Sequence, residues 1–116
     1  MCYFCSLKQD GLVGIVEDNY PVTKGHVLIF PTQHIRYLED VPEDTLTELW
    51  ATVTRFVREL DCDCNIGINN GRWAGQTVHH LHVHIIPRTE GDVADPRGGV
   101  RWVIPEKADY WTGLGR

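Results

Sequence analysis

The sequence predicts an α+β fold, with one long helix and a mostly antiparallel sheet of about five strands. The helix is predicted at about residues 43–60, where apolar side chains recur at helical spacing. The strands are predicted from short apolar or alternating runs on both sides of this helix. The order strand, strand, helix, strand, strand, strand places the helix against one face of the sheet, with short segments at the termini.

Each element has its own local signal. Pro42 suits a first helical turn, and Glu43 and Asp44 favour the positive end of the helix dipole. The apolar stripe that follows comprises Leu46, Leu49, Trp50, Val53, Phe56, Val57 and Leu60. Asp18 to Pro21 reads as a turn, because Asp and Asn bond their own backbone and proline fixes φ. Strands are predicted at 12–16, 26–30, 65–69, 77–86 and 101–104.

Length and composition predict one compact domain, residues 1–116, of an ordinary globular type. The formal net charge is −5, so no overall positive field attracts nucleic acid, and a small anion would need a local pocket. We expect no membrane partner, because no apolar run approaches the ~18 residues of a membrane span. The N-terminus lacks a basic region followed by an apolar one, which favours a cytoplasmic location.

Four of the six histidines lie within residues 79–84. Since side chains alternate faces along a strand, His80, His82 and His84 project from one face, and His79 falls on the other. The apolar residues between the three histidines can pack on the core. Three neighbouring imidazoles can bind zinc or perform proton and nucleophile chemistry near neutral pH, and spacing alone does not separate these functions.

The segment Gly75-Gln-Thr-Val-His-His-Leu-His-Val-His-Ile-Ile-Pro-Arg88 resembles the signature of the histidine-triad superfamily, His-φ-His-φ-His-φ-φ, where φ is apolar. Gly25-His26 and the apolar residues that follow resemble the glycine-histidine strand upstream of that signature. The resemblance implies the histidine-triad (HIT) fold and an enzyme, a nucleotide hydrolase or nucleotidyl transferase. Such an enzyme attacks the α-phosphate of a dinucleoside polyphosphate or a nucleoside phosphoramidate through a nucleotidyl-histidine intermediate. Residues 97–105 look more like the diadenosine polyphosphate hydrolase branch.

The resemblance also implies roles for single residues. His82 would be the nucleophile, with its other nitrogen donating to a backbone carbonyl. His84 would bond phosphate oxygens and carry a positive charge that offsets them. His26 would stand behind the triad without reacting. The substrate-binding residues would be Asp18 at the ribose hydroxyls, Asn69 near the leaving phosphate, Gln76 and Thr77 at the phosphate, and His84.

The spacing Cys2-x-x-Cys5 is half of a common zinc site, and zinc needs two more ligands. Cys62 and Cys64 would complete a four-cysteine site, and His34 and His80 would complete a mixed one. The resemblance to prokaryotic histidine-triad proteins favours the mixed site, with a structural zinc that catalysis does not require. Unliganded thiols are the simpler alternative. Under the mixed site, Cys62 and Cys64 are ordinary thiols near the helix end.

Two other functions fit the same residues. A regulatory module would bind a nucleotide with little turnover, and a zinc-binding protein would use all three triad histidines on one metal. We also expect a homodimer, which the resemblance implies and which would cover the large side chains of Trp50 and Phe56 and the open sheet edges. A monomer covered by its own tail, Asp109–Thr112, is the alternative.

Overall fold

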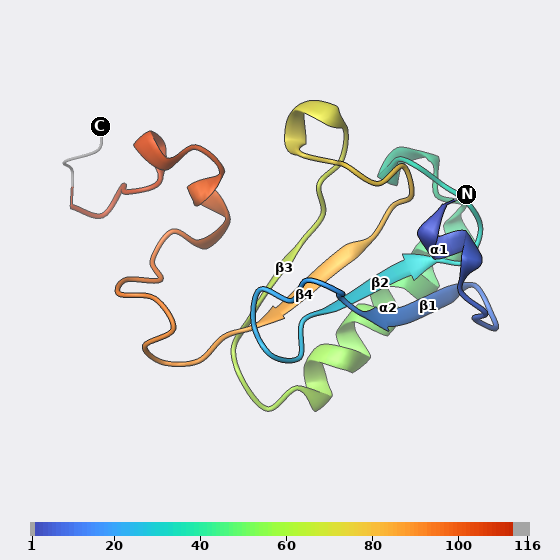
Figure 1. Cartoon of the computed structure of the whole chain (residues 1–116), viewed down its shortest axis with the longest axis horizontal. Coiled ribbons are helices and arrows are strands. Elements are labelled where there is room, and N and C mark those ends of the chain that lie inside the picture. Colours follow the sequence, from blue (N-terminus) through green and yellow to red (C-terminus); the bar gives the residue numbers. More distant parts are fainter. Residues whose placement is uncertain (1, 113–116) are drawn as a thin grey trace.

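A computed structural model describes residues 2–112 and confirms the α+β fold. A four-stranded antiparallel sheet has the order β1-β2-β4-β3 (Figure 1). The strands are β1 (Val13–Glu17), β2 (Val27–Pro31), β3 (Cys64–Gly67) and β4 (Val83–Pro87). The long helix is α2 (Glu43–Glu59), within one residue of its predicted end.

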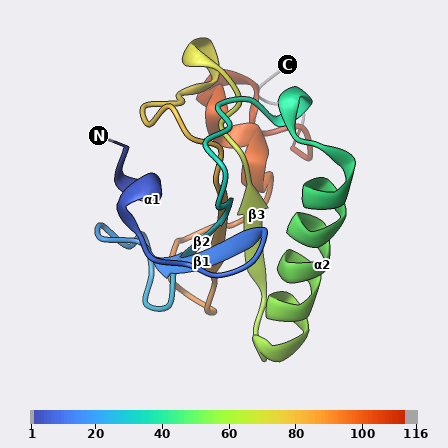
Figure 2. The same ribbon diagram turned by 90° about the vertical axis from the view of Figure 1, so that its right-hand side faces the viewer.

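One face of the sheet packs against α2, as Figure 2 shows. Leu49 and Val53 of the helix are buried against apolar side chains of β2 and β4. The sheet contributes Val27, Ile29, Val83 and Ile85 to this core. In the described part of the chain, no helix has the length and apolar character needed to cross a membrane.

The opposite face of the sheet carries the histidines and a short N-terminal helix, α1 (Tyr3–Ser6). Phe4 of α1 is buried against Phe30 and Leu28 of β2, with its ring 4.7 Å from that of Phe30. The sequence does not predict α1, because a single turn is too short to show helical periodicity. Its packing anchors the N-terminus beside the end of β2.

The predicted strand over residues 77–86 is regular only at Val83–Pro87. The backbone before it turns away from the ladder, and the N–H of Leu81 donates to the carbonyl of Ile35 at 2.7 Å. The His80 side chain is fully buried below this turn. The pattern of buried side chains therefore begins before β4 does, because residues in the irregular backbone that precedes the strand are buried as well.

The predicted strand over residues 101–104 is wrong, and the sheet has four strands instead of five. The segment Gly99–Val103 forms a 3-10 helix, η3, followed by a second one, η4 (Pro105–Lys107). Gly98 has a φ of +94°, and the N–H of Arg101 donates to its carbonyl. This glycine turn starts a helical path that the apolar pattern of 100–104 does not reveal. We call residues 89–112 the C-terminal arm, which extends from β4 past the β3 edge (Figure 1).

The homodimer remains a prediction, and two features favour it. Trp50 of α2 stays 40% exposed, and β3 pairs with β4 alone among the described residues. An exposed aromatic residue and an unpaired edge both gain from a second copy. Light scattering over a range of concentrations is expected to give about twice the chain mass of 13.2 kDa. A constant mass near that of one chain, with full activity, would contradict the prediction.

Candidate functional site

Two cysteines and two histidines converge where α1 meets the sheet. Cys2 and Cys5 are presented by the turn of α1, His34 follows β2, and His80 precedes β4. The Sγ atom of Cys2 is 3.3 Å from His80 Nδ1, and Cys5 Sγ is 3.2 Å from His34 Nδ1. One ligand atom from each of the four residues lies within 4.8 Å of the others. Tetrahedral zinc with Zn–S and Zn–N bonds of about 2.3 and 2.0 Å separates such atoms by about 3.5 Å, so the four residues fit this ion.

The buried ring of His80 is held in the orientation that a metal ligand needs. Its Nε2 donates to the carbonyl of Pro31 at 2.7 Å, which leaves Nδ1 unprotonated toward the two thiols. Burial lowers the pKa of His80, which favours this neutral form. A backbone acceptor behind a ligating histidine is a common feature of zinc sites.

The alternative four-cysteine site is not assembled. Cys64 pairs with Pro87 at the end of β4 that is remote from His80. Cys62 is exposed at the end of α2, as a free thiol. The structure therefore groups the N-terminal cysteines with His34 and His80.

His82 lies beside α1, and one of its two ring nitrogens is engaged in a hydrogen bond. Its Nδ1 is 2.8 Å from the carbonyl of His80, so Nδ1 carries the proton and donates. The ring packs on Phe4, with centroids 4.9 Å apart, and next to His84, at 5.0 Å. The neutral ring therefore keeps an unprotonated Nε2 that can act as a nucleophile.

A backbone amide fixes the protonation of His26 and, through it, that of His84. The N–H of Val22 donates to Nδ1 of His26 at 3.0 Å, so the proton of neutral His26 is on Nε2. That Nε2 lies 2.9 Å from Nδ1 of His84 and donates to it. His84 must then carry its own proton on Nε2. The Oδ2 atom of Asp18 lies 3.5 Å from His26 Nε2, so its negative charge faces the proton on that nitrogen.

This arrangement makes neutral His84 a hydrogen-bond donor through Nε2. Burial, followed by the neighbouring rings of His82 and His26, lowers the pKa of His84 to about 4, against an opposing effect of Asp18. Below that pKa the ring is charged, and at pH 7 it is neutral. The neutral ring offers its Nε2–H as a hydrogen-bond donor, and the positive charge predicted for His84 opposite a substrate phosphate stays a prediction.

Asp18, His26 and His84 also place three potential metal-ligand atoms within 4.8 Å of one another. The Val22 N–H bond argues against a metal there, because it occupies Nδ1 of His26 and requires a proton on Nε2. A histidine protonated on that nitrogen cannot ligate through it. The three side chains are better described as a hydrogen-bonded chain.

A cavity of about 960 Å³ opens on the histidine face of the sheet. Asp18, His26, Asn69 and His84 line it, so the structure brings together four of the predicted site residues. His82 does not line the cavity, although its ring lies beside that of His84, and Gln76 and Thr77 are placed elsewhere. The buried Gln76 amide bonds the backbone of Gly71, Arg36 and Val78. Thr77 lies in a separate depression with Cys2 and His34.

Several residues that line the cavity carry no recognisable signal in the sequence. Val22 acts through its backbone amide, which any residue except proline provides. Arg88 donates two bonds to Asp92 and one to Asn65, and all three residues line the cavity. Trp102 also lines it, from a segment that was expected to be a strand. The apolar periodicity and the histidine run on which the predictions rest do not extend to these positions.

The fold and this arrangement of histidines define a protein of the histidine-triad class. The HIT domain family model matches residues 6–91, most of the chain, and the chain belongs to this family. An uncharacterised HIT-like protein of Methanocaldococcus jannaschii is 38% identical over 106 residues, which cover 79% of this chain and 82% of that protein. The asymmetrical bis(5'-nucleosyl)-tetraphosphatase of Schizosaccharomyces pombe is 39% identical over 80 residues, 65% of this chain and 44% of that enzyme.

A solved structure also resembles the chain. The zinc-bound histidine-triad protein of Mycobacterium smegmatis superposes with a TM-score of 0.70 and is 34% identical, covering 81% of this chain and 79% of that one. A family relative with this fold therefore holds zinc, which agrees with the chemistry of the cysteine and histidine cluster described above.

Proposed function

We propose that this HIT-family hydrolase cleaves a nucleoside phosphate by attack of His82 Nε2 on the α-phosphorus. The substrate is a dinucleoside polyphosphate or a nucleoside phosphoramidate. The observation that carries the proposal is the bond from His82 Nδ1 to the carbonyl of His80, because it leaves the Nε2 lone pair free. A ring held in this tautomer is activated for covalent catalysis without a separate base.

The reaction proceeds in two displacements. In the first, a P–N bond forms to His82 while the bond from phosphorus to the leaving group breaks, and the leaving group departs with the electron pair. In the second, a water oxygen bonds phosphorus, the P–N pair returns to Nε2, and the water proton is released. The net change is hydrolysis to a nucleoside monophosphate and the leaving group.

Residues of the cavity next to His82 supply binding and charge stabilisation. The Nε2–H of His84 donates to a phosphate oxygen, and the Asn69 amide donates near the leaving group. Asp18 accepts from the ribose hydroxyls through Oδ2, since its Oδ1 already accepts the N–H of Tyr20. The side-chain amide of buried Gln76 holds the loop before the triad through its hydrogen bonds to backbone groups. The cysteine and histidine cluster anchors α1 next to His82.

Two observations disfavour the other functions. A zinc protein using all three triad histidines needs them to converge, whereas His80 faces the cysteines and His84 bonds His26. A binding module with little turnover has no need of a histidine whose second nitrogen is held by a backbone carbonyl. The free Nε2 of His82 therefore favours the enzyme.

Intact mass measurement tests the covalent step directly. The protein is mixed with excess diadenosine tetraphosphate or adenosine phosphoramidate and unfolded at alkaline pH, where a P–N bond to histidine survives. A mass increase of one adenylyl group during turnover is expected. Multiple turnovers without any adduct would indicate direct attack by water, and binding without adduct or turnover would indicate a regulatory module.

A further inference from the structure

The cavity continues from the histidines to the C-terminal arm. At the sheet it is lined by His84 and Asn69 together with Ile66 and Ile86, and its other end is built by η3 and the loop before it. The apolar side chains of that end are Val93, Pro96, Val100 and Trp102, and its charged ones are Asp92 and Asp95. A volume of about 960 Å³ is at the upper end of the roughly 300–1,000 Å³ typical of small-molecule pockets. Ammonia or another small leaving group would occupy little of this space and would not reach η3.

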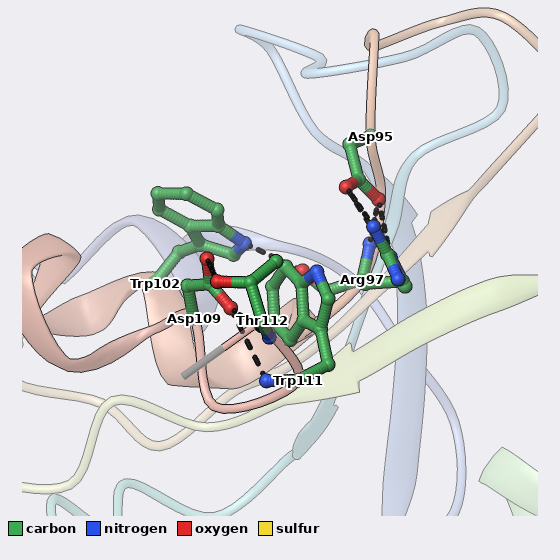
Figure 3. Close-up of polar contacts among 6 residues, drawn as sticks. All are labelled: Asp95, Arg97, Trp102, Asp109, Trp111 and Thr112. Atoms are coloured by element: carbon green, nitrogen blue, oxygen red, sulfur yellow. Dashed lines mark hydrogen bonds and ion pairs between the residues drawn. The ribbon is translucent and has the colours of Figure 1, made fainter. Parts of the chain in front are cut away.

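Trp102 is the one aromatic side chain of the arm that lines the cavity among the described residues. It remains 47% exposed. Its indole Nε1–H donates to the carbonyl of Arg97 at 2.8 Å, which fixes the edge of the ring (Figure 3). A fixed, half-exposed indole is suited to stacking on a planar group, because little rotamer freedom is lost on binding.

The structure behind Trp102 is closely packed. A side-chain carbon at Gly98 would come within 3.2 Å of both Trp102 Nε1 and the ring of Trp111. The Arg97 guanidinium stacks on Trp111 at 4.8 Å and pairs with Asp95 at 2.9 Å (Figure 3). These contacts make η3 and the loop before it a preformed wall.

The arm is also positioned against the sheet. A carbon added at Gly99 would lie 3.3 Å from Nδ2 of Asn65 in β3, so the backbone of η3 approaches the strand closely. The acidic residues of the wall are paired, with Asp92 on Arg88 and Asp95 on Arg97. The wall therefore adds little unpaired negative charge that would repel a polyphosphate.

We propose that Trp102 stacks on the base of the leaving nucleotide, so that the preferred substrates are dinucleoside polyphosphates. The inference rests on the proposed hydrolysis at His82 and adds which leaving group the site selects. The polyphosphate runs from the histidine end of the cavity, and the second nucleoside occupies the end built by η3. A phosphoramidate with a small leaving group reaches the histidines but makes no contact with Trp102.

The test compares two substrates that share the adenylyl group and differ in the leaving group, diadenosine tetraphosphate and adenosine phosphoramidate. Trp102→Ala is expected to lower kcat/KM for the tetraphosphate by roughly ten-fold or more, in line with the loss of one stacked base. The phosphoramidate should change by less than about two-fold. Trp102→Phe keeps an aromatic face and should retain most of the tetraphosphate activity.

Val103→Ala is the matched control, because Val103 is 80% exposed on the same helix and does not line the cavity. Equal losses on both substrates, or none on either, would overturn the inference and leave the hydrolysis intact. If the wild type hydrolyses neither substrate, the proposed function fails, and the subsite is tested by binding. ATP, the leaving group of the tetraphosphate, should bind Trp102→Ala more weakly than the wild type, and equal affinities would refute the subsite.

Discussion

His82→Ala is expected to reduce turnover by at least about a thousand-fold, because it removes the atom that bonds phosphorus. The remaining residues would still bind the substrate, so the affinity for a nucleoside monophosphate should change little. The measurement is single-turnover hydrolysis of a nucleoside phosphate, together with the melting temperature and a binding titration. This combination separates a lost nucleophile from a lost fold.

His79→Ala provides the matched control. His79 belongs to the same histidine run but is exposed and falls outside the period-two set. Its replacement should leave the rate near that of the wild type. Near-normal turnover in a folded His82→Ala protein would refute the covalent mechanism, independently of the rate of the His79→Ala protein.

Removing the metal is expected to have the largest effect on stability. Freshly prepared protein should contain about one zinc per chain, bound by Cys2, Cys5, His34 and His80, because four ligand atoms converge there. The ligands join the N-terminal helix to the sheet, so binding energy of the ion contributes to folding. Chelation should lower the melting temperature by roughly 10 °C or more.

Variants decide which residues hold the ion. His34→Ala should lose zinc, measured by elemental analysis, and should melt at the temperature of the chelated wild type. Cys62→Ser and Cys64→Ser should keep it, because both thiols lie apart from the cluster. Loss of zinc in these two serine variants, with retention in His34→Ala, would contradict the mixed site.

Local patterns determined much of this protein. The stripe from Leu46 to Leu60 specified α2 because burial on one face requires a 3.6-residue period. Asp18 to Pro21 specified a turn, and the N–H of Tyr20 does bond the Asp18 carboxylate at 2.8 Å. The alternation around the triad indicated which histidines share a face, because apolar neighbours had to point the other way.

Only the tertiary structure decided what each polar group bonds. The Val22 amide fixes the tautomers of His26 and His84, and no side-chain pattern encodes a backbone contact made by a turn. Gln76 had the right type for a phosphate contact, but burial commits its amide to backbone partners. In the C-terminal arm, two consecutive glycines with positive φ override an apolar run that resembles a strand. Trp102 consequently lies in the cavity wall, because the path of the backbone, and not the spacing of residues, places it there.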